Sequence, residues 1–315
     1  MYRASGVGEG TPTEVVSKTC FIERYQRGPV LFLVYKEPRA KSEKLEGTVL
    51  PVVSSKKNGS DCLPGALRDI ERLGLSNYRS VVSRARKRHQ WRWEDPDIGP
   101  VKWLDCSDKA SERYRHSYIA LAHELVHGLT GPDCVWDPTK DKSICFRLDP
   151  LALPPAAVAR SKIRFANRQT QLTVEHFQNL YLPVGGAASI VHILDELTAY
   201  GLSTEGLIRL VETKQIGTSL NLLPMFLFYT ANYLRNLELR TPDKFAKYFG
   251  RGTTNRASVL SLTKRGEQLM EKWIKANRSV RRGGHPYGEA ENSFFNDYKE
   301  LKRECGLWST VTDGT

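Results

Sequence analysis

The sequence predicts an α+β fold, because runs of strand type stand near its start and helical patterns dominate after them. Residues 29–36 (PVLFLVYK) are mostly apolar, with β-branched and aromatic side chains, as expected of a buried strand. Apolar residues at helical spacing occur over about 109–130, within 185–203 and over most of the chain beyond 203. Strands and helices do not alternate, which argues against a doubly wound parallel sheet.

The expected elements before residue 100 are a second strand and a first helix. Residues 48–53 (TVLPVV) are the expected strand. Pro51 indicates an edge strand or a bulge, because proline has no N–H to donate to a sheet. A turn at 54–61 follows. Helical spacing over 63–74 then predicts a helix that stops at Gly74.

The middle of the chain is expected to contain one long helix. A short strand at 101–106 precedes a helical pattern over about 109–130, which ends at a Gly-rich turn. Residues 131–160 are rich in Pro, Asp and Cys and predict a long irregular excursion. A short element at 173–182 follows, and 185–203 contains another helix.

Beyond residue 203 the pattern is mostly helical. The segment 203–213 opens with Ser-x-Glu, which is typical of a helix start. Interruptions are expected at 251–258 and 281–289. We therefore expect a flexible leader, a main folded domain and a helical C-terminal subdomain packed on it. Their bounds are 1–25, 26–213 and 214–315.

The 315 residues carry a net charge of +12, from 47 basic and 35 acidic side chains. This excess favours an acidic partner, which is nucleic acid, an anionic membrane face or an acidic protein. No apolar run approaches the roughly 20 residues of a membrane-spanning helix. The polar N-terminus lacks the apolar segment of a secretory signal peptide. We expect a soluble, cytoplasmic protein.

The six cysteines are scattered without a CxxC spacing, unlike a disulfide framework or a zinc ribbon. We expect free thiols in a reducing compartment, which act mostly as small apolar side chains. The six are Cys20, Cys62, Cys106, Cys134, Cys145 and Cys305.

The stretch AHELVHG, residues 122–128, carries the clearest chemical signal. Residues four apart in a helix differ by about 40° around the axis, so His123 and His127 can reach one ion. Zinc accepts imidazole nitrogen, and a catalytic zinc keeps one position open for water. Glu124 lies beside the pair, where it can take a proton from that water. The pattern predicts two zinc ligands and a general base.

The alternative for this stretch is a helix in which hydrogen bonds satisfy both histidines and the glutamate lies at the surface. With this composition, HExxH arises by chance in roughly one sequence of this length in a hundred. The apolar residues around the motif favour a helix through the centre of a domain. They are Tyr118, Leu121, Ala122, Leu125, Val126 and Leu129.

A catalytic zinc needs a third protein ligand, and residues 191–201 (VHILDELTAYG) offer one. The segment has the apolar residues of a core helix, and buried carboxylates are unfavourable unless paired or metal-bound. We expect Glu196 to be the ligand and Asp195 to accept a hydrogen bond from a ligand imidazole. His192 is an alternative ligand or a further supporting partner. The other interpretation is a surface-facing acidic pair on an amphipathic helix.

HELVHG followed after a long excursion by DELTAYG resembles the glutamate-zincins, over residues 115–205. It is most similar to the clostridial neurotoxin light chains and to zinc peptidase effectors that Gram-negative pathogens inject into host cells. The resemblance implies a zincin-like fold, with a small mixed sheet packed on the active-site helix, and a zinc endopeptidase exported into a host cell. In those families a second helix carries a pair of acidic residues, of which the second is a zinc ligand, and an aromatic residue one turn later. The resemblance maps the ligand to Glu196, the first acid to Asp195 and the aromatic residue to Tyr200.

In such an enzyme zinc lowers the pKa of its water and polarises the scissile carbonyl, while Glu124 passes a proton to the leaving amine. The developing oxyanion then needs a hydrogen-bond donor. The candidate donors are Tyr200 and, on a Gly-rich loop, Arg282, His285 and Tyr287. A plain surface loop is the alternative for the last three.

The stretch 83–93 (SRARKRHQWRW) interleaves cations with tryptophans, a combination that can bind nucleic acid. It can equally dock an acidic protein substrate or form a solvated helix face over buried tryptophans. Three functions follow from the sequence. They are a zinc endopeptidase acting on a protein, a nucleic-acid-binding protein with an incidental HExxH, and a non-catalytic structural zinc protein.

Overall fold

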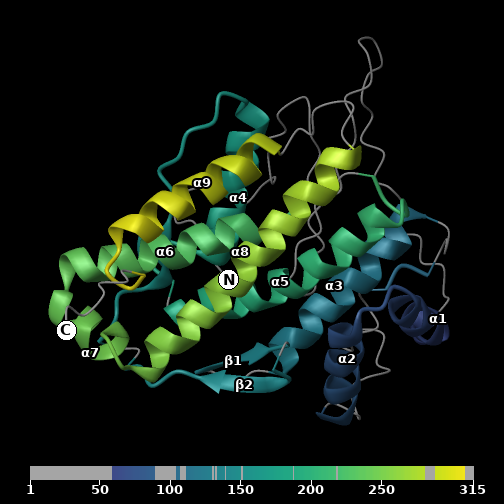
Figure 1. Ribbon diagram of the computed structural model, residues 1–315, viewed down its shortest axis with the longest axis horizontal. Coiled ribbons are helices and arrows are strands. Elements are labelled where there is room, and N and C mark those ends of the chain that lie inside the picture. Colours follow the sequence, from purple (N-terminus) through teal and green to yellow (C-terminus); the bar gives the residue numbers. More distant parts are fainter. Residues whose placement is uncertain are drawn as a thin grey trace, which may run out of the picture. The chain divides into compact units, whose positions relative to one another are not determined.

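The structure is a computed structural model, and the residues that it describes all lie within Ser55–Thr315. This part of the chain is mostly helical and includes a two-stranded antiparallel sheet (Figure 1). The described residues are 59–88, 104–106, 111–129, 131, 133–138, 140–149, 152–186, 188–217, 219–280 and 288–308. The expected leader and the expected strands at 29–36 and 48–53 lie outside them.

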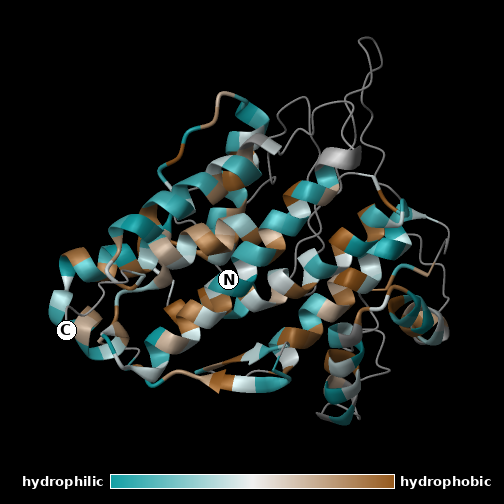
Figure 2. Ribbon diagram, viewed as in Figure 1, coloured by the Kyte–Doolittle hydropathy of each residue, from teal (hydrophilic) through white to brown (hydrophobic). Residues whose placement is uncertain are grey.

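The α-helices confirm the expectation of a largely helical chain after residue 109, and two more precede that point. They are α1 (Gly59–Arg72), α2 (Ser76–Arg88), α3 (Glu112–Gly128), α4 (Arg168–Tyr181), α5 (Ile190–Glu212), α6 (Leu223–Arg240), α7 (Pro242–Phe249), α8 (Thr254–Val280) and α9 (Gly288–Glu304). Polar and apolar residues alternate along most of them in Figure 2, because each buries one face.

The helix α5 is the element on which much of this fold is built. It packs against α3, α6 and α8 and against the first strand of the sheet. Ser189 caps its start by accepting a hydrogen bond from the backbone N–H of Val191. Ser111 caps α3 in the same way by accepting from the backbone N–H of Tyr114. Most residues of α5 are buried, so the polar ones among them require partners.

The segment 131–160, expected to be irregular, contains a β-hairpin. Its strands are β1 (Cys134–Asp137) and β2 (Lys142–Cys145), which pair antiparallel with Cys134 opposite Cys145. A 3₁₀ helix, Ala156–Ala159, follows. Each strand has only four residues, too few to show an alternating pattern in a segment rich in turn formers.

The expectation of free thiols is wrong for four of the six cysteines. Cys62 is joined to Cys106, and Cys134 is joined to Cys145 across the hairpin. Cys305 is a buried free thiol, as expected, and burial raises its pKa to about 12. The spacings of 44 and 11 residues match no sequence pattern, since pairing is set by the fold. The reducing compartment inferred from free thiols loses that support.

Three element boundaries also differ from expectation. The helix α1 begins at Gly59, inside the expected turn, and residues 104–106 are not a strand. The helix α5 continues without a break through residue 203. The Ser203 hydroxyl does not cap a new helix, because it donates to the carbonyl of Ala199 in the preceding turn.

The helices after residue 213 pack on α5 and on one another within one compact unit, Ser55–Thr315. The domain boundary expected at that residue stays a prediction. The described sheet is antiparallel, and the zincin-like arrangement with a mixed sheet also stays a prediction. Among the described helices, none has both the length and the apolar character needed to cross a bilayer.

Candidate metal site

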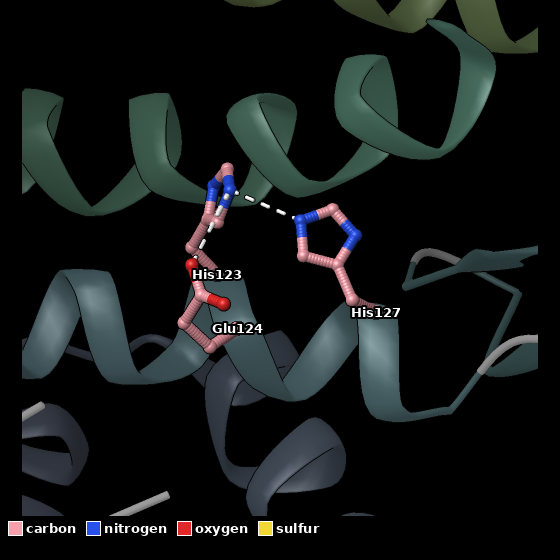
Figure 3. Close-up of side chains that lie close together, drawn as sticks. All are labelled: His123, Glu124 and His127. Atoms are coloured by element: carbon pink, nitrogen blue, oxygen red, sulfur yellow. Dashed lines mark hydrogen bonds and ion pairs between the residues drawn. The ribbon is translucent and has the colours of Figure 1, made fainter. Parts of the chain in front are cut away.

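The helix α3 presents three polar side chains within an apolar surrounding. His123, Glu124 and His127 each offer one ligand atom, and these atoms all lie within 4.8 Å of one another (Figure 3). The side chains of His123 and Glu124 are only 8% and 10% exposed. This group of two imidazoles and a carboxylate, in which His123 is buried and the other two are half-buried, could hold a metal ion.

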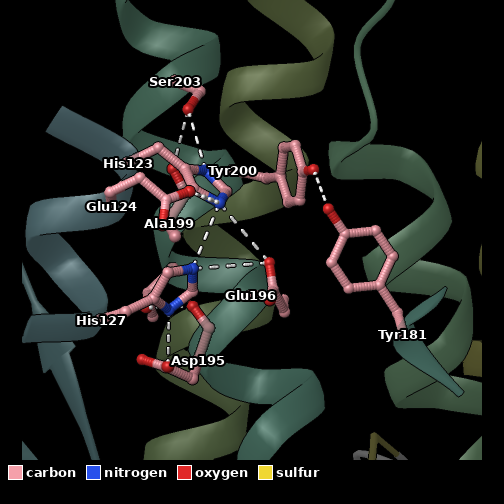
Figure 4. Close-up of polar contacts among 10 residues, drawn as sticks. His123, Glu124, His127, Tyr181, Asp195, Glu196, Ala199, Tyr200 and Ser203 are labelled. Atoms are coloured by element: carbon pink, nitrogen blue, oxygen red, sulfur yellow. Dashed lines mark hydrogen bonds and ion pairs between the residues drawn. The ribbon is translucent and has the colours of Figure 1, made fainter. Parts of the chain in front are cut away.

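The antiparallel helix α5 supplies a partner for each histidine (Figure 4). Oδ2 of Asp195 lies 2.7 Å from Nδ1 of His127, which is the hydrogen bond to an imidazole expected of this residue. Oγ of Ser203 lies 3.2 Å from Nδ1 of His123. Both imidazoles are therefore held through Nδ1, with Nε2 left to face the space between the helices.

These contacts decide where each neutral imidazole carries its hydrogen. The carboxylate of Asp195 only accepts, so Nδ1 of His127 donates and its Nε2 carries a lone pair. The hydroxyl of Ser203 donates to the carbonyl of Ala199 at 3.2 Å, so it accepts from Nδ1 of His123. The lone pair of His123 is then also on Nε2.

A carboxylate oxygen completes this arrangement. The two Nε2 atoms lie 3.2 Å apart, and Oε2 of Glu196 lies 3.6 Å from that of His123 and 3.7 Å from that of His127. Oε2 is buried and makes no hydrogen bond to any residue that the structure describes. Three atoms with lone pairs thus converge on one point, which is unfavourable without a cation among them.

In the absence of a metal, a proton on His127 relieves part of this repulsion. Burial lowers the pKa of His127, but the carboxylates of Glu196 and Asp195 outweigh it and raise the pKa to about 9. Burial acts to raise the pKa of Glu196, and the imidazoles of His127 and His123 bring it below its ordinary value. A metal ion would have to displace the proton from His127.

The donor set and its spacing fit zinc. Two donors bound tetrahedrally to zinc at about 2.0–2.1 Å lie roughly 3.4 Å from each other. The separations among His123, His127 and Glu196 are 3.2, 3.6 and 3.7 Å, on either side of that value. Imidazole nitrogen is a common zinc ligand, whereas calcium and magnesium take oxygen donors.

Glu124 borders this triangle of donor atoms. Its Oε1 lies 3.9 Å from Nε2 of His123, farther than any two corners of the triangle are from each other. A carboxylate in this position is close enough to exchange a proton with a group bound between the histidines. Its role as general base stays a prediction.

Tyr200 contacts the site through its ring rather than its hydroxyl. The ring packs edge-on against His123, with centroids 4.4 Å apart, and the hydroxyl is hydrogen-bonded to that of Tyr181 at 2.6 Å (Figure 4). Burial raises the pKa of both phenols well above the ordinary value, with a further contribution from Glu196, so both keep their protons. The expected role of Tyr200 as oxyanion donor stays a prediction.

The remaining candidates are not brought into the triangle. His192 is half-buried on α5 and contributes electrostatically to the lowered pKa of Glu196, but it is not one of the three donors of the triangle. Arg282, His285 and Tyr287 lie outside the described residues, so their expected role is untested.

Sequence reasoning did not single out Ser203 or Tyr181. Ser203 follows Glu196 by seven residues on one helix, a spacing that places both on one face, so helical periodicity could have indicated it. Tyr181 belongs to α4, and nothing in the spacing along the chain brings that helix to Tyr200.

The described part of the basic stretch 83–93 has a structural partner. Nε of Arg84 lies 2.7 and 2.8 Å from the two carboxylate oxygens of Asp141, and its guanidinium lies 5.2 Å from the ring centroid of Trp136. Arg84 thus ties α2 to the hairpin. Residues 89–93 lie outside the described part of the chain.

No family model, curated protein or solved structure matches the chain. The candidate metal site therefore rests on the geometry of its own residues. The resemblance of HELVHG and DELTAYG to the glutamate-zincins stays a prediction from those motifs.

Proposed function

We propose that this protein is a zinc-dependent endopeptidase, in which His123, His127 and Glu196 hold the ion. The observation that carries the proposal is the convergence of two imidazole nitrogens and a carboxylate oxygen at 3.2–3.7 Å from one another. Three protein ligands are typical of catalytic rather than structural zinc, because the fourth position then accepts water.

Two arguments favour Glu196 over Glu124 as third ligand: its distances to the two imidazole nitrogens, and the need for a carboxylate that acts as a base. Oε2 of Glu196 is nearly equidistant from both Nε2 atoms, whereas Oε1 of Glu124 is 3.9 Å from that of His123. This assignment leaves Glu124 free of the metal. A peptidase of this kind needs such a second carboxylate as its base.

Bound zinc supplies a Lewis acid, which makes water more acidic and polarises a peptide carbonyl. Glu124 accepts a proton from the attacking water and delivers it to the leaving amine. Asp195 and Ser203 hold the imidazoles so that both Nε2 atoms face the space where the ion would bind. The net charge of +12 favours an acidic protein as the substrate.

The test compares wild type with Glu124→Gln in a cell lysate, followed by sequencing of newly formed peptide termini. Glutamine keeps the size of the side chain but cannot accept the proton, so cleavage should fall about a hundredfold to ten-thousandfold. Zinc content should remain near one ion per chain. Glu271→Gln, an exposed change on α8, is the matched control and should cleave like wild type.

Two results would reject the proposal. One is equal cleavage by wild type and Glu124→Gln, which would mean that the proteolysis comes from a contaminant. The other is the absence of new termini with fully zinc-loaded wild type across lysates of different origin.

A structural zinc site is the second candidate, favoured by the low exposure of the ligands. The side chains of His123 and Glu196 are each 8% exposed, and only His127, at 24%, opens appreciably to solvent. In that case chelation of zinc would lower the thermal unfolding midpoint strongly, and Glu124→Gln would change neither stability nor any cleavage.

A further inference from the structure

We infer that Ser203 is a positioning residue of the metal site, which fixes the tautomer of His123 so that Nε2 is ready for the ion. The inference rests on the proposed zinc site. It goes beyond the ligands themselves, because it assigns a role to a neutral side chain one helix away.

The hydroxyl of Ser203 has one hydrogen, and the helix determines where that hydrogen goes. It donates to the carbonyl of Ala199, at 3.2 Å, one turn earlier on α5. The lone pairs of the same oxygen are then directed to Nδ1 of His123, also at 3.2 Å (Figure 4). The imidazole must donate from Nδ1, and a metal ligand is left at Nε2.

The other tautomer would obstruct the site. With hydrogen on Nε2, His123 would point an N–H at the space between His127 and Glu196, where the ion is expected. Ion binding would then require the tautomer to change first. Ser203 removes this step by holding the imidazole in the form that can bind.

A neutral partner at this position also limits the negative charge of the site. Glu124, Asp195 and Glu196 already surround the two imidazoles, and the zinc ion brings two positive charges. A fourth carboxylate at residue 203 would be buried, since Ser203 is 8% exposed, and would make the loaded site more negative. Serine supplies an acceptor without adding charge.

The substitution Ser203→Ala tests the inference with little risk to the fold, because alanine is the better helix former. We expect zinc affinity, measured by competition with a chelating indicator, to fall about tenfold to a hundredfold. Ser203→Thr should stay within about threefold of wild type, because a threonine hydroxyl in a helix also bonds to the carbonyl one turn back.

The matched control is Ser117→Ala on α3. Ser117 is equally buried, and its hydroxyl also donates to a helix carbonyl, that of Tyr114, at 2.7 Å. This hydrogen bond lies within α3 and does not involve the histidines. Its removal should leave zinc affinity unchanged, which separates the loss of the His123 contact from the loss of a buried hydroxyl.

A second readout needs neither zinc nor activity. Nitrogen-15 spectra of the zinc-free protein should show His123 with its hydrogen on Nδ1 in wild type, and a mixture of tautomers in Ser203→Ala. The inference is overturned if wild type binds zinc and Ser203→Ala binds it equally well, or if wild-type His123 carries its hydrogen on Nε2. Failure of wild type to bind zinc at all would instead reject the proposed function.

Discussion

At the scale of single residues, Oε2 of Glu196 is the atom that distinguishes a metal site from a pair of hydrogen-bonded histidines. A proton on Nε2 of His127 can form a hydrogen bond to Nε2 of His123, which lies 3.2 Å away. The same proton does not satisfy Oε2 of Glu196. This atom lies 3.6 and 3.7 Å from the two Nε2 atoms, which is longer than a hydrogen bond. A zinc ion would bind all three atoms.

Alanine substitutions on α5 should rank these neighbours by zinc affinity. Glu196→Ala removes the proposed third ligand and should weaken binding by at least a hundredfold. Asp195→Ala removes only the partner of His127 and should cost about tenfold to a hundredfold. His192→Ala should have little effect. Competition with a chelating indicator measures all three, and an equal or larger loss at His192 would mean that the third ligand is misassigned.

The sequence predicted which side chains of α3 and α5 lie close together better than it predicted their surroundings. His123 and His127 lie four residues apart on one helix, so periodicity alone places these two side chains on a common face. The contact of Asp195 with His127 followed from the need of a ligand imidazole for an acceptor. Tyr181 could not be predicted, because it reaches Tyr200 from a separate helix through tertiary packing.

At the scale of elements, α5 stays helical through two glycines that have different surroundings. A Cβ on Gly206 would lie 2.2 Å from the hydroxyl of Tyr78, whereas one on Gly201 would meet only Leu269, at an ordinary 3.7 Å. The Tyr78 hydroxyl is fully buried and donates to the carbonyl of Leu202 at 2.7 Å, so it cannot move without losing that bond.

Gly206→Ala should therefore lower the free energy of unfolding by about 1–3 kcal/mol through overpacking. Gly201→Ala is the matched control on the same helix, and it should be neutral or stabilise by up to about 1 kcal/mol through helix propensity. Urea unfolding followed by circular dichroism measures both. Similar effects at the two positions would show that α2 does not pack so closely on α5.

Strong periodicity made α3 and α5 predictable. The short strands of the hairpin were not predicted, and the reason is physical. The hairpin strands have four residues each and are held by a cross-strand disulfide and by Arg84 from α2. Neither constraint is visible in local sequence. The continuity of α5 was missed because a Ser-x-Glu pattern does not reveal that Ser203 bonds backwards along its own helix.

At the scale of the whole molecule, two disulfides flank the helix that carries the candidate metal site. Cys62–Cys106 joins α1 to the segment before α3, and Cys134–Cys145 closes the hairpin after it. They enclose loops of different length, with sequence separations of 44 and 11 residues. A longer loop loses more chain entropy in the unfolded state when it is closed.

Replacing both cysteines of a pair by alanine should destabilise accordingly. We expect a loss of about 4 kcal/mol for Cys62 with Cys106 and about 3 kcal/mol for Cys134 with Cys145. Denaturant unfolding measures both. Thiol titration of the unreduced, unfolded protein is the control. More than two reactive thiols among the six cysteines would show that at least one pairing is absent.

The proposed function requires one ion held between α3 and α5, and diffraction at the zinc absorption edge locates such an ion directly. We expect one anomalous peak at about 2.0–2.2 Å from Nε2 of His123, Nε2 of His127 and a carboxylate oxygen of Glu196. A folded protein that shows no peak in the presence of zinc, or a peak bound by other residues, would contradict it.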